Sequence, residues 1–479
     1  MSENKPTEEV LISNNASNHP QHKITTVDNY DLDDETVQFD NKTMENINEE
    51  QRTFKERWFG PLTEGGVRVS TMTATAMTFG TGCMTFPYII GQVGVVPGVV
   101  IFLLVSFSML YTLDLLLKGS LNANTFNFGE LTKKSLNNGG FIVYNVSTII
   151  FLIGAVMTYQ LTSYQFFMDI FAQYFYIQEQ PLPLKWRYAI IITVSCFVIQ
   201  VPLCLYEKMS RLKYTPIIAT CAIIIIMLII FIVFLFHIDF SSDDIKWFIG
   251  EGLHGDFWNN ISVITNAFVV FMFGYLNHNG FLLVMKNLQN PTEKRTTKVM
   301  RRSFWIEFIV YFVLALSGYF LTPSNTNFNT NEMFLNTGLG GSGTALEYYF
   351  GVAKVIMVLC LQSLIPLRWS LLKESLFSFF KDNQINKTAD TIITVVMLII
   401  MNYSLLFVDN VVNIIGFVGG IFGVLVCYFI PLFIYIGIFG KKKVKSIIGY
   451  ILLIFFGIIG VISTIFSLIK AFKGNSAPS

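Results

Sequence analysis

Charged side chains are scarce in this sequence. They make up only 14% of its 479 residues, and the 33 Lys and Arg nearly balance the 32 Asp and Glu, for a formal net charge of +1. A nucleic-acid-binding protein is expected to carry a basic excess, so this balance argues against nucleic acid as a partner. Hydrophobic residues instead make up 53% of the chain, which is typical of an integral membrane protein surrounded by lipid.

Cysteine is also rare, and catalytic patterns are lacking. The six cysteines lie inside apolar segments without metal-site spacing, so we interpret them as small core residues. The sequence shows no pairing of a nucleophile with a base, and the glycines near Gly80 are not followed by Lys-Ser or Lys-Thr as in a nucleotide-binding loop. We therefore expect no enzymatic activity, no metal and no cofactor.

The first 57 residues differ from the rest of the chain. They are rich in Asn, Asp and Glu, as in DLDDETVQFDN (Asp31 to Asn41), and contain no apolar stretch long enough for a signal sequence. Such a segment cannot bury enough apolar surface to offset its conformational entropy. We expect residues 1–57 to be a disordered tail and residues 58–479 to form one transmembrane domain.

Eleven apolar stretches are long enough to cross a bilayer as helices, which takes about 20 residues. This pattern predicts an all-α integral membrane protein. The approximate bounds of the stretches are Val69–Ile90, Val96–Leu117, Phe141–Tyr174, Tyr188–Leu205, Thr215–Ile238, Trp258–Met285, Phe304–Leu321, Tyr348–Leu367, Thr391–Phe407, Val412–Phe439 and Ile447–Ile469.

Basic residues concentrate in loops that share one side with the N-terminus. Examples are KNLQNPTEKRTTKVMRR (Lys286 to Arg302) and KKKVK (Lys441 to Lys445). Because cytosolic loops carry an excess of Lys and Arg, the N-terminus is predicted to be cytosolic. The membrane itself is left open between the plasma membrane and an endolysosomal or vacuolar membrane.

Two of the eleven stretches are interrupted. The first contains TFGTGCMTFPYIIGQVG (Thr78 to Gly94), and the sixth contains VVFMFGYLNHNGFLLVM (Val269 to Met285). Irregular backbone is tolerated at membrane depth only where it lines a cavity or is packed in protein. Because the interruptions are five spans apart, residues 69–238 and 258–439 can form inverted repeats, with an eleventh helix over 447–469. Such a pair of interruptions points to a transporter binding site.

The paired interruptions predict a site for a zwitterion. Free amides at Gly80, Thr81 and Gly82, together with the positive end of a half-helix, would bind a carboxylate. Carbonyls freed around Phe273 and Gly274 would bind an ammonium group. An α-amino acid carries both groups, so it is the expected substrate.

The glycines have a second interpretation, since small residues also allow helices to pack closely. We favour that interpretation for GFVGGIFG (Gly416 to Gly423). In the third span, Tyr159 and Ser163 lie on one helical face and either line the cavity or form hydrogen bonds between helices. The expected substrate-binding residues are Thr78, Gly80, Thr81, Gly82, Cys83, Tyr159, Ser163, Phe273, Gly274, Tyr275 and Asn277.

Ionisable residues at bilayer depth are functional hypotheses because a charge there is costly. Lys354, near the middle of the eighth span, either replaces a bound cation by bracing the first span against the eighth or extends to the outer interface. His278 either relays protons or only satisfies the opened backbone. Lys354 and His278 are the candidate coupling residues. Glu307 lies near the cytosolic end of the seventh span, close to Arg301 and Arg302, and is expected to be a surface carboxylate rather than a coupling site. The same is expected of Asp114 and Asp169 near span ends.

At these residues the chain resembles the amino acid/auxin permease family, which includes sodium-coupled neutral amino acid transporters and proton-coupled ones. The resemblance implies a LeuT-like fold, with two five-helix inverted repeats plus one helix, and secondary active transport of amino acids by alternating access. It runs from about Arg68 to Tyr435 and rests on the order of several motifs: Gly80-Thr81-Gly82 and Phe86-Pro87-Tyr88; Phe273-Gly274-Tyr275 and Asn277-His278; Asn287-Leu288 and Pro291; Ile365-Pro366-Leu367-Arg368; and Gly416, Gly419, Gly420 and Pro431.

Two departures from the family concern the coupling ion. Sodium-coupled relatives carry an Asn where this chain has Ala76, and hydroxyl residues in the eighth span where this chain reads KVIMVLCLQS (Lys354 to Ser363). Sodium needs several oxygen ligands. The departures favour transport of neutral amino acids coupled to protons, or facilitated exchange, over sodium-coupled symport. A non-transporting amino acid sensor would share these features, whereas an ion channel would be expected to have symmetry-related pore helices.

Overall fold

The computed structural model describes residues 63, 65–174, 184–205, 215–237, 244–321, 345–379, 386–407, 411–441 and 443–474. The tail predicted over residues 1–57 lies outside these ranges. Every regular element within them is helical: α3 (Val67–Thr78), the 3-10 turn η1 (Thr81–Thr85), α4 (Phe86–Val93), α5 (Val95–Asn122), α6 (Phe128–Tyr174), α7 (Leu184–Val194), α8 (Val201–Leu205), α9 (Thr215–His237), α10 (Phe257–Tyr275), α11 (His278–Lys286), α12 (Glu293–Leu321), α14 (Ala345–Phe377), α15 (Lys387–Ser404), α16 (Val411–Phe417), α17 (Ile430–Phe439) and α18 (Val444–Gly474).

Eight helical segments in the described part of the chain are long and apolar enough to cross a membrane: α5, α6, α9, α10 with α11, α12, α14, α16 with α17, and α18. The chain is therefore an integral membrane protein with multiple spans. The other three expected spans correspond to α3 with α4, α7 with α8, and α15. These helices are too short or too polar to qualify by themselves, so the count of eleven stays a prediction.

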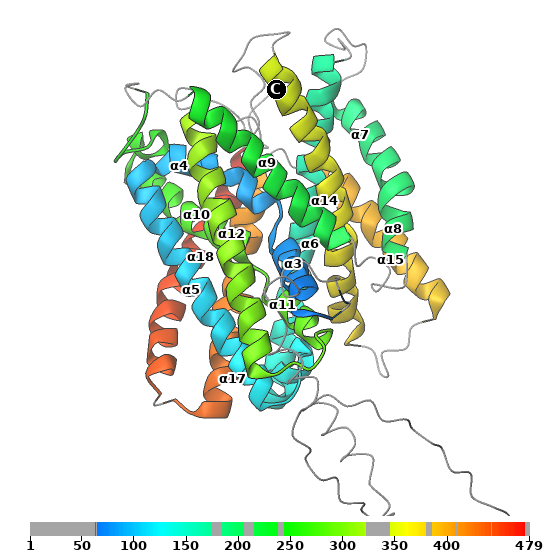
Figure 1. Cartoon of the computed structure of the whole chain (residues 1–479), viewed down its shortest axis with the longest axis vertical. Helices are drawn as coiled ribbons and strands as arrows, with labels where there is room; N and C mark the ends of the chain where they lie inside the picture. Colours follow the sequence, from blue (N-terminus) through cyan, green and yellow to red (C-terminus); the bar gives the residue numbers. More distant parts are fainter. Residues whose placement is uncertain are drawn as a thin grey trace, which may run out of the picture. The chain divides into compact units, whose positions relative to one another are not determined.

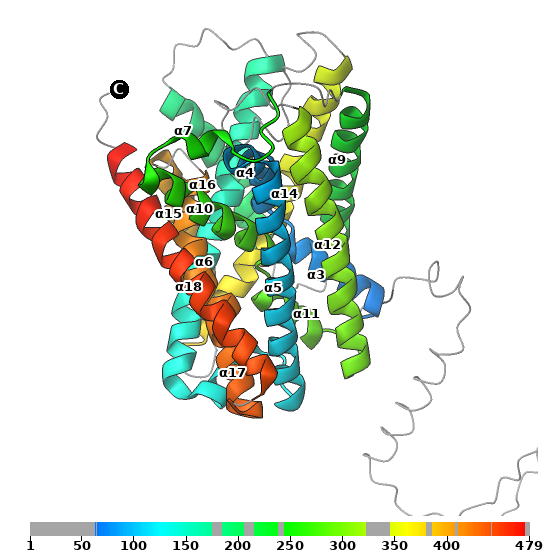
Figure 2. The same cartoon turned by 90° about the vertical axis from the view of Figure 1, so that its left-hand side faces the viewer.

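The interrupted helices lie inside the bundle. In the segment Phe257–Lys286, which holds α10 and α11, 94% of the most apolar window is buried, against 33% in Val444–Lys470 of α18. Helix α3 contacts α9, α11, α12 and α14, and η1 contacts α10 (Figure 1). Figure 1 shows α3 between α12 and α14 and above α11, and the view turned by 90° again shows α3 above α11 (Figure 2). The two interruptions thus meet where polar backbone can find partners in protein rather than lipid.

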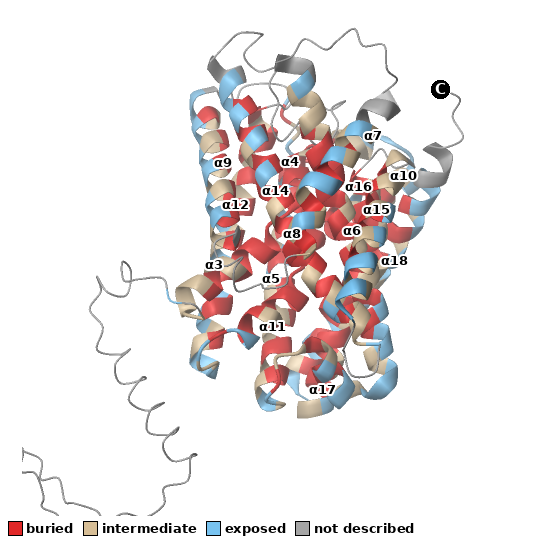
Figure 3. Cartoon of the chain, turned by 90° about the vertical axis from the view of Figure 1, so that its right-hand side faces the viewer, coloured by how far each residue is buried: buried red, intermediate tan, exposed pale blue. Residues whose placement is uncertain are grey.

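Buried residues gather on the inner faces of the helices and exposed ones on the outer faces (Figure 3). Many of the exposed residues are large and apolar. Helix α9 illustrates this pattern, because its exposed side chains include Ile218, Leu228 and Phe236. An exposed row of this kind fits contact with lipid tails. Five of the six cysteines are buried, as expected, but Cys221 of α9 is exposed on this row, and all six are free thiols.

The glycine run in the tenth span serves helix packing, as predicted. A Cβ at Gly416 would lie 2.1 Å from the hydroxyl oxygen of Ser467, and one at Gly420 would lie 2.2 Å from that of Thr464. Both partners belong to α18. The backbone here widens to a π-helix over Val418–Gly423, and Ile421 N donates to the Thr464 hydroxyl (3.1 Å). The run therefore brings α18 against the bundle.

Candidate functional site

The first interruption lies where the sequence predicts it. Helix α3 ends at Thr78, after which Phe79 (φ −61°, ψ 134°) and Gly80 (φ −174°, ψ −162°) are extended. The chain then forms the 3-10 turn η1 and enters α4 at Phe86. Pro87 stands in the first turn of α4, where proline is favoured because its missing N–H has no helical acceptor. Local sequence thus sets both edges of this break.

The second interruption is displaced from its predicted position. Helix α10 continues through Tyr275, and the break falls at Leu276 (φ −75°, ψ 94°) and Asn277 (φ −136°, ψ 17°), before α11 begins. The prediction that Phe273 and Gly274 carry free carbonyls is wrong in this structure. The Phe273 carbonyl accepts from Leu276 N (3.2 Å), and the Gly274 carbonyl accepts from the Tyr311 hydroxyl (3.0 Å).

The two interrupted helices touch through their glycines. A Cβ on Gly82 would lie 2.7 Å from Gly274 Cα, and one on Gly274 would lie 2.4 Å from Cζ of Phe86. The space that we expected for a carboxylate at Gly82 is therefore filled by the backbone of α10. In this conformation the close-packing interpretation of Gly82 and Gly274 holds.

Side chains of α6 and α14 cover the first interruption from the other side. Tyr159 Oη donates to the Phe79 carbonyl (3.2 Å) and accepts from Arg368 Nε (3.3 Å). A Cβ on Gly80 would lie 2.3 Å from the same hydroxyl. Tyr159 therefore forms an interhelical hydrogen bond, the second of its two expected roles. Ser163 does not reach the break, because its hydroxyl donates to the Tyr159 carbonyl (2.7 Å) within α6.

The remaining predicted residues of the first break also have local partners. Thr81 Oγ1 donates to Thr158 Oγ1 of α6 (2.9 Å), and Cys83 Sγ donates to the Gly80 carbonyl (3.0 Å). The bond from Thr81 joins η1 to α6, and that from Cys83 closes the turn on itself. Thr158 was not among the predicted residues, although it stands next to Tyr159 in the sequence.

Arg368 is a residue at this site to which sequence reasoning assigned no role. Its side chain is buried, and its Nη2 donates to the carbonyl of Met77 in the last turn of α3. In the described part of the chain no carboxylate forms an ion pair with it. A guanidinium is always charged, and a cation is favoured at the C-terminal end of a helix. The family motif that ends in Arg368 was the available signal.

Lys354 does not brace the first span against the eighth. Its Nζ lies 3.2 Å from Asp169 Oδ2, so it links α14 to α6 instead. The Lys354 side chain is 5% exposed and that of Asp169 is 33% exposed, so this pair lies at the edge of the buried interior. Arg368, on the same helix, occupies the position against α3 that we had assigned to Lys354.

Glu307 is buried at the end of α3, and the prediction of a surface carboxylate is wrong. Its side chain faces α3, and the hydroxyl of Thr78 lies 3.0 Å from Oε1. Four residues later on the same face of α12, the hydroxyl of Tyr311 lies 3.0 Å from the Thr78 carbonyl oxygen. Sequence position near a cluster of Arg residues suggested the surface, whereas the spacing of Glu307 and Tyr311 was the signal for a shared buried face.

His278, at the start of α11, has partners for both ring nitrogens. Nε2 lies 3.0 Å from Thr112 Oγ1, and Nδ1 lies 3.3 Å from Cys427 Sγ. The Thr112 hydroxyl donates its single proton to the Met109 carbonyl (3.1 Å), so Nε2–H is the donor to Thr112 and the thiol donates to Nδ1. These contacts suit a neutral imidazole with a structural role, which links α11 to side chains of α5 and of the tenth span rather than to the opened backbone.

Asn277 connects the two interruptions directly. Its Nδ2 donates to the Ala74 carbonyl of α3 (2.9 Å), while its Oδ1 is buried without a described partner. A cavity of about 20 Å³ adjoins this residue, and its lining includes Thr78, Tyr275, His278 and Glu307. That volume is enough for about one water molecule.

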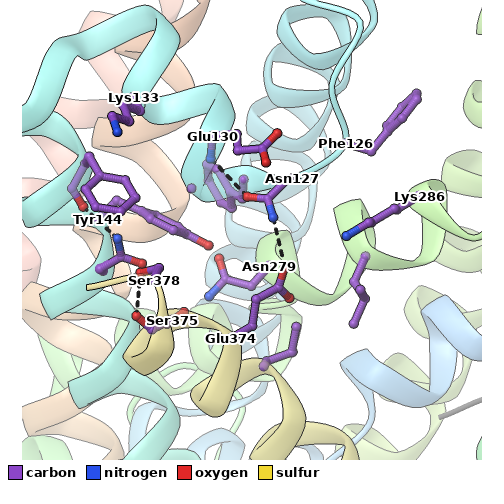
Figure 4. Close-up of a pocket in the computed structure, with 16 residues that line it drawn as sticks. Phe126, Asn127, Glu130, Lys133, Tyr144, Asn279, Lys286, Glu374, Ser375 and Ser378 are labelled. Carbon is purple, nitrogen blue, oxygen red and sulfur yellow. Dashed lines mark hydrogen bonds between the residues drawn. The ribbon is translucent and has the colours of Figure 1, made fainter. Parts of the chain in front are cut away.

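A larger cavity of about 560 Å³ lies on the other face of α11 (Figure 4). Glu374 of α14 and Lys286 of α11 project toward it, and Asn127 Nδ2 donates to Glu374 Oε1 (2.9 Å). Asn279 also lines it, with Oδ1 free of described partners. The volume is within the usual range for a small-molecule site, so this cavity can admit a polar solute to the edge of the interruptions.

The sequence is similar to those of known transporters. The family described as "Transmembrane amino acid transporter protein" matches residues 63–473. A Plasmodium berghei protein provisionally named amino acid transporter AAT1 is 24% identical over 319 residues, which cover 64% of this chain and 48% of that protein. A Danio rerio protein provisionally named sodium-coupled neutral amino acid transporter 11 is 21% identical over 322 residues, 67% of each chain.

Solved structures show the fold. A Na+-coupled sialic acid symporter in a substrate-bound outward-open state superposes with a TM-score of 0.53 at 13% identity, over 89% of this chain and 93% of that one. A manganese transporter of Eremococcus coleocola gives 0.52 at 10% identity, over 86% and 89%. This chain spans about half the length of its Plasmodium relative. Since the family match covers most of the described helices and agrees with the order of motifs around the two interruptions, the chain belongs to the transmembrane amino acid transporter protein family, the amino acid/auxin permeases.

Proposed function

We propose that this protein is a secondary active transporter of neutral amino acids that works by alternating access and is coupled to protons. The observation that carries the proposal is the contact between two interrupted helices, made where Gly82 of the first meets Gly274 of the second. Interrupted helices at equivalent places in two repeats are the usual frame of a midplane substrate site. The eleven-span layout, the inverted repeats and the cytosolic N-terminus belong to the same proposal.

The zwitterion site is proposed to open when the two interruptions separate. In the present conformation Gly82 and Gly274 are in contact, while the 560 Å³ cavity lies beside residues whose loops are predicted to be cytosolic. We interpret this state as one with the central site closed and a cytosolic vestibule formed. Movement of α3 and η1 away from α10 would expose the amides of Gly80 to Gly82 and the end of α10.

The substrate is expected to be uncharged in its side chain. Phe86 packs on Phe271 with ring centroids 4.9 Å apart, and Phe79 packs on Tyr311 at 5.4 Å, so aromatic rings surround the contact point of the two interruptions. Such a wall accommodates an apolar side chain and gives no partner for a second charge. The name of the zebrafish relative, which refers to neutral amino acids, agrees with this class.

Proton coupling is favoured over sodium coupling by the position of Arg368. In sodium-coupled transporters with interrupted helices, carbonyls at the C-terminal end of a half-helix coordinate the ion. Here the guanidinium already donates to one of these carbonyls, that of Met77. The same cation would repel a sodium ion placed beside it. Sodium-coupled symport, suggested by the zebrafish relative's name, is the alternative.

The test is uptake by the purified full-length protein in proteoliposomes. A panel of radiolabelled amino acids is offered under an imposed pH gradient, an imposed sodium gradient, or neither. We expect neutral amino acids to accumulate above equilibrium under the pH gradient alone. Accumulation that requires sodium would establish the alternative. Saturable binding without transport under any gradient would identify a sensor and reject the proposal.

A further inference from the structure

We propose that Glu307 is the proton-carrying residue of this protein, and that its proton decides which partner the Thr78 hydroxyl takes at the end of α3. This inference rests on the proposed function, because it names the group through which proton movement is linked to the first interruption. Sequence position favoured a surface carboxylate over this role, and the buried position of Glu307 reverses that preference.

Glu307 is buried without a counter-ion among the described residues. The residue is 6% exposed, and no Lys, Arg or His in the described ranges forms an ion pair with it. A carboxylate without water or a cation is costly at membrane depth, which marks the residue as functional. The residues that line the cavity beside it are Thr78 of α3; Met109, Leu110 and Leu113 of α5; Tyr275 of α10; Asn277; His278 and Phe281 of α11; and Ser303 and Phe304 of α12. Tyr311 of α12 contacts the same Thr78.

Only Tyr275, Tyr311 and His278 in that set can titrate. Tyr311 donates its proton to the carbonyls of Thr78 and Gly274, and the hydrogen bonds of His278 suit a neutral ring. Neither of them supplies a positive charge to Glu307. Glu307 is therefore the acid best placed to exchange a proton with the cavity of about 20 Å³.

The Thr78 hydroxyl has one proton and two oxygen neighbours. Its hydroxyl oxygen lies 3.1 Å from the Ala74 carbonyl and 3.0 Å from Glu307 Oε1. A threonine hydroxyl has one proton, and a carbonyl cannot donate. If that proton goes to Ala74, the bond to Glu307 exists only when the carboxyl carries a proton and donates it. Both contacts are complete hydrogen bonds in the protonated form of Glu307.

Loss of the proton changes this pattern. The O–H bond of the carboxyl breaks, and the proton passes to a water molecule in the adjoining cavity, which can hold about one water. Thr78 then donates to the carboxylate, and the Ala74 carbonyl loses the Thr78 hydroxyl but keeps the Asn277 amide (2.9 Å). Because Asn277 belongs to the second interruption, deprotonation alters the contact between the last turn of α3 and the second interruption.

The experiment compares Glu307→Gln with Glu307→Asp and with Glu293→Gln. Glutamine can donate to Thr78 permanently, as the protonated acid does, but it cannot release a proton. Glu293 is an exposed carboxylate in the first turn of the same helix, so its substitution is the matched control. Each full-length variant is reconstituted, and accumulation under a pH gradient and exchange of internal for external substrate are both measured.

We expect Glu307→Gln to lose accumulation and its pH dependence while exchange remains measurable, Glu307→Asp to recover part of the accumulation, and Glu293→Gln to match the unmodified protein. Accumulation by Glu307→Gln driven by the pH gradient would overturn the role of Glu307 and leave the proposed function standing. If the unmodified protein shows no proton-driven accumulation, both proposals fail.

Infrared difference spectra between acid and alkaline buffer provide a readout that does not depend on transport. We expect the carbonyl band of a protonated carboxylic acid to change with pH in the unmodified protein and in Glu293→Gln, and a component of that change to be missing in Glu307→Gln. Identical difference spectra for all three proteins would contradict proton exchange at Glu307, even if the substitution reduced transport for structural reasons.

Discussion

The hydroxyl of Tyr311 lies 3.0 Å from the Gly274 carbonyl oxygen, one residue before the end of α10. The same hydroxyl lies 3.0 Å from the carbonyl of Thr78, the last residue of α3. One proton is therefore shared by the ends of both interrupted helices. Tyr311 joins the two half-helices at the point where each loses its regular hydrogen bonds.

Replacement of Tyr311 by phenylalanine should weaken this junction. Both carbonyls would lose a buried donor, and an unsatisfied buried acceptor costs about 1–3 kcal/mol. We expect a lower thermal unfolding midpoint in detergent, together with reduced amino acid uptake. Tyr450 of α18, whose hydroxyl forms no hydrogen bond with the described residues, offers a tyrosine-to-phenylalanine control. Equal midpoints for the two variants would show that the Tyr311 hydroxyl contributes nothing to the junction.

Gly82→Ala should abolish uptake while the protein still inserts. The added Cβ would lie 2.7 Å from Gly274 Cα, which is backbone and cannot rotate away. Overpacking of this kind costs roughly 1–3 kcal/mol, and it also displaces α10 from η1. Gly457→Ala in α18 is the matched control, because nothing lies within 4 Å of its added Cβ. Uptake is measured with the same proteoliposome assay, and normal transport by Gly82→Ala would refute the close contact.

Arg368 should be required as a fixed cation against α3. In Arg368→Met the side chain stays long and unbranched but loses the donors to Met77 and Tyr159, so we expect uptake to be lost. Arg368→Lys, which keeps the charge but not the planar fork, should retain a fraction of it. The exposed Arg301, replaced by Met, serves as the control.

The same protein provides a test of sodium independence. We expect uptake by the unmodified chain to be unchanged when sodium is replaced by choline on both sides of the membrane. A steep dependence on sodium, with Arg368→Met still active, would show that the guanidinium does not take the place of a bound ion.

The Lys354–Asp169 pair should stabilise the packing of α14 on α6. Lys354 is 5% exposed, so Lys354→Met replaces a buried charge but leaves Asp169 without its cation. A double-mutant cycle with Asp169→Asn isolates their interaction, which we expect to be on the order of 1–3 kcal/mol for a pair that is only partly buried. Unfolding in detergent provides the free energies. An interaction of zero would show that this ion pair does not stabilise the packing of α14 on α6.

Much of this architecture could be predicted from local sequence. Apolar stretches mark most of the helices, and the sequence Gly80-Thr81-Gly82 followed by Pro87 locates the first break within a residue of its position. These features depend on backbone chemistry: glycine and proline change the helix in their own turn, whatever surrounds them. The motif order likewise identified the family without any knowledge of contacts.

The ionic partners of the site could not be predicted in this way. Whether Glu307 faces arginines or the end of α3, and whether Lys354 or Arg368 reaches the first break, depends on how helices remote in the sequence are rotated against each other. The second break moved to Leu276 and Asn277 for a related reason, since Tyr311 of α12 satisfies the Gly274 carbonyl and lets α10 continue. Sequence alone determined where the first break falls, because glycine and proline act on the backbone of their own turn. Only the tertiary structure decided which side chains meet there, because a buried charge or carbonyl takes its partner from whichever helix packs against it.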